Sequence, residues 1–301
     1  MTWPRCRSHD PGALRLQRLA LAALVYVRFS ALRPYSEQPF PVGIARYVDF
    51  SFLANDVVAW WLKAGLVLSL VLYVIGRAMP LAVGYMLFLW VAAGALANSQ
   101  GALSHYTQLV AMVLIGQLIA YAQWWAMDRT SGRAPQGMNA HDLALYYTQQ
   151  VIAAAYVLAG ISKIVLSRGR WIAQVPFMAS DVLKTHGQSF ASTLAGGVIE
   201  RGDAIAAFIL AHPDLMRALL GCGLLFELAA PAALLGRTPA FLIGIGLLTM
   251  HAVIGQLMLI RFPENQVLLL IYFIDVPFLL VAAWRRLLIP TIDHARQRAG
   301  A

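Results

Sequence analysis

Long apolar stretches alternate with short polar connections along almost the whole chain. Eight of these stretches are long enough, or nearly so, to form helices that cross a bilayer, which takes about 20 residues. They lie at 19–32, 57–76, 80–97, 103–127, 143–166, 215–235, 239–260 and 267–288. The first is short and the third marginal, so seven spans is the alternative to eight. The pattern predicts an all-α, polytopic integral membrane helix bundle of about eight transmembrane helices.

One connection differs from the others in its length. Residues 167–214 form a long, extracytoplasmic connection of mixed polarity, and a connection of that size usually has a function. Its segments 172–183 and 204–210 are candidates for interfacial helices that lie on the membrane. We expect one transmembrane domain over 1–301, with the helical bundle at 15–288. No internal repeat is visible in the sequence, which disfavours a secondary transporter.

Composition and charge narrow the class of protein. The chain is 60% hydrophobic and 12% charged, whereas soluble domains are about 45–50% apolar and about 25% charged. The net charge of +9 comes from scattered basic residues, so no nucleic-acid partner is expected. Basic residues in both tails, and their absence from the short loop 98–102, predict cytoplasmic termini. The lipid bilayer is therefore the expected partner, and a bacterial inner (cell) membrane the expected location.

Ionisable residues inside apolar stretches need an explanation, because each costs about 2.5–3.5 kcal/mol at the centre of a bilayer. Lys163 is the most informative of them. At 100° per residue, Gln149, Tyr156 and Lys163 fall within about 40° of one another and form a polar stripe. Gly160 lies one turn below the lysine and allows a helix or a ligand ring to approach closely. Apolar surroundings disfavour the ammonium form, so the amine is a candidate general base; snorkelling to the headgroups is the alternative.

Three further residues are candidates on chemical grounds. Glu227 precedes Pro231 by four positions, which predicts a local kink beside a buried carboxylate. Its alternative role is a structural ion pair with Arg28 or Lys63. His251 lies inside an apolar stretch, where an interhelical hydrogen bond is the alternative to catalysis. His105 opens a stretch near the outer interface, where it is either a pocket group or a simple helix-start residue. No second ligand at helical spacing supports a metal site, so none is expected.

Several segments resemble, in order, the membrane domain of vitamin K-dependent gamma-glutamyl carboxylase. Ala-Gly-Ile-Ser-Lys163 is similar to a lysine-bearing stretch of that family that is followed by a tryptophan, here Trp171. His251, with Gln256 five residues later, is similar to its His-x4-Gln segment. Ser104-His105-Tyr106 takes the place of an Asn-His-Ser-Tyr motif. Leu-Phe-Glu227 resembles an acidic position ahead of the histidine helix. On these motifs the chain resembles the horizontally transferred transmembrane (HTTM) domain family.

The resemblance implies a carboxylase-like lyase, or quinol epoxidase, that uses a reduced naphthoquinone and no metal. Lys163 would be the base that deprotonates the quinol, and His105 and His251 would be catalytic pocket groups. Residues expected to contact the substrate are Tyr156, Gly160, Trp171, Glu227 and Gln256. A peptide or protein is a further expected substrate. The sequence departs from the family in having one lysine in this stretch, and we do not expect a large extracytoplasmic domain in it. A non-catalytic membrane factor for maturation or export of a small peptide is therefore the alternative function.

Overall fold

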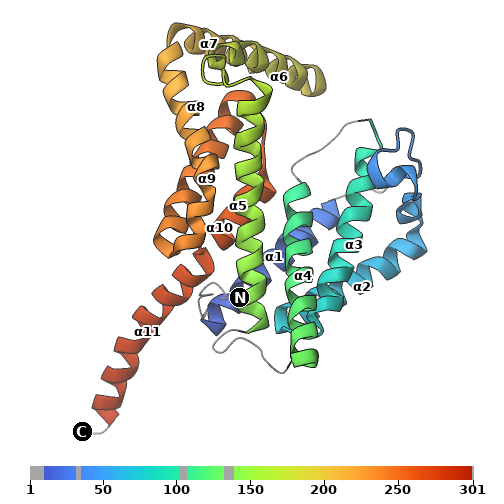
Figure 1. Cartoon of the computed structure of the whole chain (residues 1–301), viewed down its shortest axis with the longest axis vertical. Coiled ribbons are helices and arrows are strands. Elements are labelled where there is room, and N and C mark those ends of the chain that lie inside the picture. The colour runs from blue at the N-terminus through green and yellow to red at the C-terminus, as the bar shows by residue number, and fades with distance from the viewer. Residues whose placement is uncertain (1–9, 32–34, 102–106, 132–138, 300–301) are drawn as a thin grey trace. The chain divides into compact units, whose positions relative to one another are not determined.

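The computed structural model describes residues 10–31, 35–101, 107–131 and 139–299. In that part of the chain the regular structure is helical throughout, and every apolar stretch described above falls largely within helices (Figure 1). The helices are α1 (Pro11–Ala31), η1 (Gly43–Arg46), η2 (Ser51–Ala54), α2 (Asp56–Ile75), α3 (Met79–Asn98), α4 (Gln108–Ser131), α5 (Ala140–Leu166), η3 (Val175–Phe177), α6 (Met178–Thr193), α7 (Val198–Ala211), α8 (Pro213–Leu228), η4 (Ala230–Leu235), α9 (Arg237–Met258), α10 (Pro263–Tyr272) and α11 (Val276–Ala299).

The number of helices able to cross a membrane is smaller than the sequence pattern predicts. Within the described residues, five helices are long and apolar enough by themselves: α2, α3, α4, α5 and α9. The count rises to seven if α7 with α8, bent by 96°, and α10 with α11, bent by 47°, are each one span. The protein is thus an all-α integral membrane protein with five to seven candidate spans. The predicted first span at 19–32 lies largely in α1, which does not qualify as a membrane-spanning helix because it contains Arg15, Arg18 and Arg28.

The chain falls into two compact units. Unit 1 comprises Met1–Val151 and Leu270–Ala301, and unit 2 comprises Ile152–Leu269. Helix α5 belongs to unit 1 up to Val151 and to unit 2 from Ile152 on. Helix α10 belongs to unit 2 up to Leu269 and to unit 1 from Leu270 on. The expectation of a single domain over 1–301 stays a prediction.

Unit 1 is built on α1 to α4, in which consecutive helices mostly pack against one another. Helix α3 contacts α1, α2 and α4, and α1 also contacts α11. Local signals set the ends of α2: the Asn55 side chain accepts the backbone N–H groups of Val57 and Val58, and Gly76 follows the last turn with φ +78°. Such a left-handed residue is a common helix end, and glycine adopts it without strain.

Unit 2 contains the long connection at 167–214, which is largely helical. Its helices α6 and α7 lie side by side, and α8 leaves α7 at 96° (Figure 1). Helix α7 contains the whole of the expected segment 204–210, whereas α6 covers only the second half of the expected segment 172–183, which begins as turn and 3₁₀ helix. A buried apolar cluster holds them to the start of α8 and to η3: Val175, Ala179, Val182, Ala206, Ile209, Met216 and Leu220. This end of unit 2 has a hydrophobic core of its own.

Candidate functional site

Helix α5 carries the central residue of the candidate site, and local signals define both of its ends. At the start, the Asn139 side chain accepts the backbone N–H of His141 (2.9 Å) and of Asp142 (3.0 Å), which is an N-cap. At the other end, Arg168 and Gly169 both have positive φ, and the Gly169 N–H donates to the Ile164 carbonyl at 2.8 Å. The chain therefore turns back after Leu166 and leaves Lys163 in the last turn of the helix.

Lys163 forms an ion pair with Glu227 of α8. The Lys163 ammonium donates to both carboxylate oxygens, and the two side chains are 30% and 4% exposed. The sequence favours Arg28 or Lys63 as the partner of this carboxylate, whereas the structure pairs it with Lys163. Taking two charges out of water is costly, and here each offsets the other. Glu227 lies one residue before the end of α8, and Pro231 belongs to the 3₁₀ segment η4 that follows, so the interruption expected near this proline is present.

Gly160 explains why α8 can approach α5 so closely. A Cβ atom added at this position would lie 3.0 Å from Leu228 Cδ2 and 3.3 Å from Glu227 Cβ. Close contact of helices through small residues is typical of membrane proteins. Of the two roles expected for Gly160, approach of a helix or of a ligand ring, the structure assigns the first. The glycine places Glu227 within reach of Lys163.

Trp171 contacts the same ammonium from another direction. Its ring centroid lies 5.6 Å from Lys163 Nζ, within the range in which a cation is attracted to the face of an aromatic ring. The same indole packs against the apolar cluster of α6, α7 and α8. The turn after α5 thus brings Trp171 back over the lysine.

A second polar pair lies further along α5. The Tyr156 hydroxyl is 2.8 Å from His251 Nε2 of α9, and both side chains are buried. The Phe262 ring lies 5.2 Å from the histidine ring, on the far side of the turn that ends α9. His251 Nδ1 is buried and has no hydrogen-bond partner, which is rare for a buried nitrogen. Tyr156 and Lys163 lie on the same face of α5, seven residues and about 10 Å apart along the helix, and the two pairs make up one candidate site. We call it the Lys163 site: Tyr156, Gly160, Lys163, Trp171, Glu227 and His251.

One expected residue, Gln256, does not join the Lys163 site in the structure. Gln256 is exposed, and its side-chain oxygen accepts a hydrogen bond from Arg201 of α7 at 2.9 Å. This placement follows from the helix, because five residues correspond to about 140° of rotation from His251. His105 lies outside the described residues. Phe262, which follows Gln256 in the family-like segment but is not among the residues expected to contact a substrate, borders the Lys163 site through its contact with His251.

The donors and acceptors of the Lys163 site fit a hydroquinone in their chemistry. Such a ligand has a flat aromatic ring and two hydroxyl groups, which call for aromatic neighbours and for groups that exchange protons. Trp171 and Phe262 are the aromatic neighbours. The groups that can exchange protons are Lys163, Glu227 and the unpartnered Nδ1 of His251. In the part of the chain that the structure describes, no three His, Cys, Asp or Glu side chains lie close enough together to hold a metal ion.

Comparisons of this chain with models of protein families, with curated proteins and with solved structures find no match.

Proposed function

We propose that this protein is an integral membrane enzyme that deprotonates a reduced naphthoquinone, in the manner of the carboxylase family that its motifs resemble. The proposal rests on one observation above all: α5 carries two largely buried polar pairs on one face, an amine with a carboxylate of α8 and a phenol with an imidazole of α9. The unpartnered Nδ1 of His251 supports a ligand there, because a buried nitrogen without a hydrogen bond loses about 1–3 kcal/mol.

Within the proposal, Lys163 and Glu227 act together as the base. In a medium of low polarity an ion pair loses much of its advantage over the neutral pair of amine and carboxylic acid. A proton can then pass from Lys163 Nζ to a Glu227 oxygen and leave the amine with a free electron pair. The amine accepts a new proton from an acidic hydroxyl, while Glu227 keeps the first. When bound, the reduced naphthoquinone supplies that hydroxyl and the oxidisable ring.

The remaining residues of the Lys163 site position these groups. Trp171 lies over the ammonium at 5.6 Å and limits its contact with water. Tyr156 holds His251 Nε2 at 2.8 Å, which fixes the ring so that Nδ1 stays available to a second hydroxyl or its oxyanion. We further propose a bacterial inner membrane with both termini in the cytoplasm, on the basis of the distribution of arginine and lysine.

The experiment compares the wild type with Lys163→Arg and Lys184→Ala. The proteins are purified in lipid nanodiscs and supplied with chemically reduced naphthoquinone and oxygen, and quinone epoxide is measured by chromatography. Arginine keeps the ion pair with Glu227 but does not give up its proton, so this variant should fold and make no epoxide. Lys184 is exposed on α6, and its loss should leave the rate unchanged. Absence of epoxide from folded wild type, or equal rates in wild type and Lys163→Arg, would contradict the proposal.

One observation favours the alternative of a non-catalytic membrane factor for a small peptide. The Lys163 amine is already bound by Glu227, as in a pair that only stabilises the bundle. In that case a peptide or partner recovered with the protein from native membranes should be retained equally by the wild type and by Lys163→Arg. Retention by the wild type alone would argue against it.

A further inference from the structure

A buried arginine in unit 1 lacks the counter-charge that Lys163 has in unit 2. Arg18 of α1 is 8% exposed, and no ion pair joins it to any residue that the structure describes. Arginine remains charged under all ordinary conditions. A charge held away from water and without an opposite charge is costly, so the surroundings of Arg18 call for an explanation.

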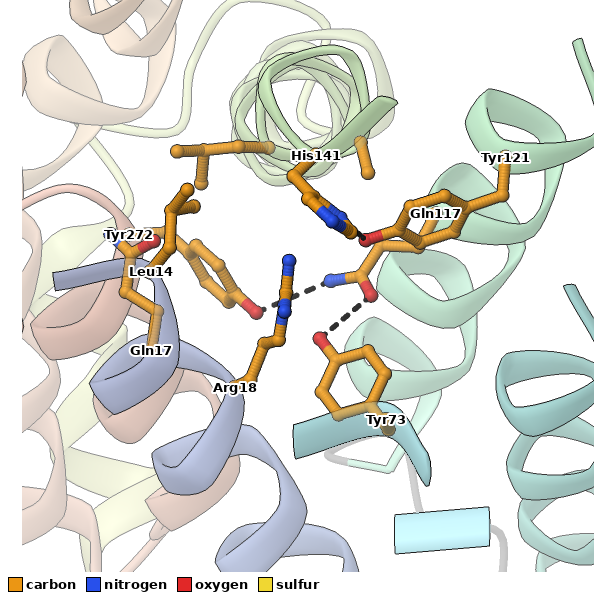
Figure 2. A pocket seen from close by; sticks show the side chains of 10 residues that line it. Leu14, Gln17, Arg18, Tyr73, Gln117, Tyr121, His141 and Tyr272 are labelled. Carbon is orange, nitrogen blue, oxygen red and sulfur yellow. Dashed lines mark hydrogen bonds between the residues drawn. The ribbon is translucent and has the colours of Figure 1, made fainter. Parts of the chain in front are cut away.

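The Arg18 side chain points into a small pocket between five helices. Figure 2 shows it extending from α1 into the space between the hydroxyls of Tyr73, Tyr121 and Tyr272. We call this space the Arg18 pocket. Its polar lining consists of Gln17, Arg18, Tyr73, Gln117, Tyr121, His141 and Tyr272. Apart from the arginine, these groups are hydroxyls, amides and an imidazole, and none of them is a carboxylate.

The hydrogen bonds of Gln117 show which donors in the pocket remain available. The Tyr73 hydroxyl donates to Gln117 Oε1 at 2.8 Å, and Gln117 Nε2 donates to Thr148 Oγ1 at 3.2 Å and to the Tyr272 hydroxyl at 3.3 Å. The Tyr272 oxygen is thus an acceptor in this network. Its own hydrogen has two places to go: the Tyr73 hydroxyl, with which Tyr272 also interacts, or a further group beside the guanidinium of Arg18.

Tyr121 and His141 form a second pair in the pocket lining that can leave a hydroxyl hydrogen available to donate. The hydroxyl lies 3.1 Å from His141 Nδ1. If that nitrogen carries the proton, it donates to the Tyr121 oxygen and leaves the phenolic hydrogen available. The positive charge of Arg18 acts on Tyr73, Tyr121 and His141. The pocket therefore gathers a permanent cation and several donors around one point. No lining residue is an anion; behind the lining, the Asp275 carboxylate accepts a hydrogen bond from Gln17 at 2.9 Å, and Asp142 follows His141.

The size of the pocket limits what it can hold. The cavity measures about 20 Å³, and a water molecule needs about 10–15 Å³ on the same scale. The space therefore suits one water or one monatomic anion, and excludes larger carboxylates and phosphate esters. Gly76 helps to keep this space open, because a Cβ atom there would lie 2.6 Å from an Arg18 guanidinium nitrogen.

We propose that the Arg18 pocket is a binding site for a small monovalent anion, with chloride as its representative. A water molecule would satisfy hydrogen bonds but would leave the charge of Arg18 without an opposite charge. A halide ion accepts hydrogen bonds from the guanidinium and from the Tyr272 hydroxyl and supplies the missing charge. No residue of the Lys163 site takes part, so this inference does not depend on the proposed enzyme activity.

The experiment measures thermal unfolding of the purified protein in potassium chloride and in potassium gluconate at equal ionic strength. A ligand that binds the folded state raises the unfolding temperature with its concentration, so chloride should stabilise the wild type and gluconate should not. Arg18→Gln should abolish the chloride effect. Tyr272→Phe removes one hydroxyl, and should raise the apparent dissociation constant for chloride about tenfold or more, as expected for a hydrogen bond to a charged group.

Arg15→Gln is the matched control, because Arg15 lies on the same helix but is exposed. It should show the chloride response of the wild type within about twofold. If Arg18→Gln does not fold, Tyr272→Phe carries the test with the same control. An unfolding temperature of the wild type that is equal in chloride and gluconate would overturn the proposal and leave water as the occupant. Equal loss of the response in the Arg15 and Arg18 variants would also overturn it.

Discussion

The two compact units each place a cation in an apolar helix, but they compensate its charge differently. In unit 2 a carboxylate on α8 pairs with Lys163. In unit 1 the groups around Arg18 are neutral hydroxyls, two amides and an imidazole. A buried cation with a partner in the chain forms a self-contained pair. A buried cation without one leaves its charge to be balanced by something that the chain does not supply.

The chemistry of the two cations agrees with this difference. A lysine beside a carboxylate can pass its proton to that carboxylate, so such a pair has a neutral form available to it. Arginine has no such option. A lysine with an adjacent acid is therefore suited to proton transfer, and an arginine among neutral donors is suited to holding an anion.

The largest expected effect comes from removing the carboxylate in unit 2, which makes that site resemble the one in unit 1. Glu227→Gln should lower the free energy of unfolding by about 3 kcal/mol, because it leaves Lys163 without an opposite charge. The measurement is equilibrium unfolding in detergent micelles. The double variant Lys163→Met, Glu227→Gln should recover most of the loss, since it removes both charges. A single variant within about 1 kcal/mol of the wild type would show that the pair contributes little.

The converse change places a carboxylate in unit 1. Gln117→Glu supplies Arg18 with a negative charge inside the pocket and should abolish the stabilisation by chloride. At a concentration one hundred times the dissociation constant, that stabilisation is about 2.7 kcal/mol for the wild type. Gln123→Glu is the control: this residue also lies on α4 and also accepts a tyrosine hydroxyl, from Tyr147 at 2.6 Å, but it does not line the pocket. The control should keep the chloride response.

A smaller effect is expected from separating the helices that carry the ion pair. Gly160→Leu forces a side chain against Leu228 and Glu227, and should cost about 2 kcal/mol of unfolding free energy, as overpacking of a close contact does. Gly94→Leu on α3 is the matched control, because a Cβ atom there meets nothing within 4 Å. Both variants are compared by unfolding in the same micelles. Equal stability of the two would mean that close approach at Gly160 is not needed.

The smallest effect tests the space around Arg18. Gly76 and Gly43 both have positive φ, +78° and +56°, so alanine at either position is strained by about 1–2 kcal/mol. At Gly76 the new Cβ also meets the guanidinium of Arg18, whereas at Gly43 it meets nothing within 4 Å. Gly76→Ala should therefore be less stable than Gly43→Ala by about 1 kcal/mol, with a weaker chloride response. Thermal unfolding of both variants in chloride and gluconate measures the difference.

Parts of the candidate site were accessible from the sequence, and parts were not. Helical periodicity places Tyr156 and Lys163 on one face of α5, and it places Gln256 away from His251, as the contact of Gln256 with Arg201 bears out. The partner of Glu227 was not accessible in this way. Each apolar helix with one charged residue is a candidate partner for every other such helix, and sequence spacing does not rank them.

The sequence alone determined that the protein is helical and built for a membrane, because apolar runs of this length have no other stable arrangement of their backbone hydrogen bonds in lipid. It also determined which residues were energetically unusual, since a charge in an apolar run is costly wherever the helix lies. Only the tertiary structure decided how each charge is compensated. That outcome depends on helix contacts such as the one at Gly160, and on which side chains face Arg18 from distant parts of the chain.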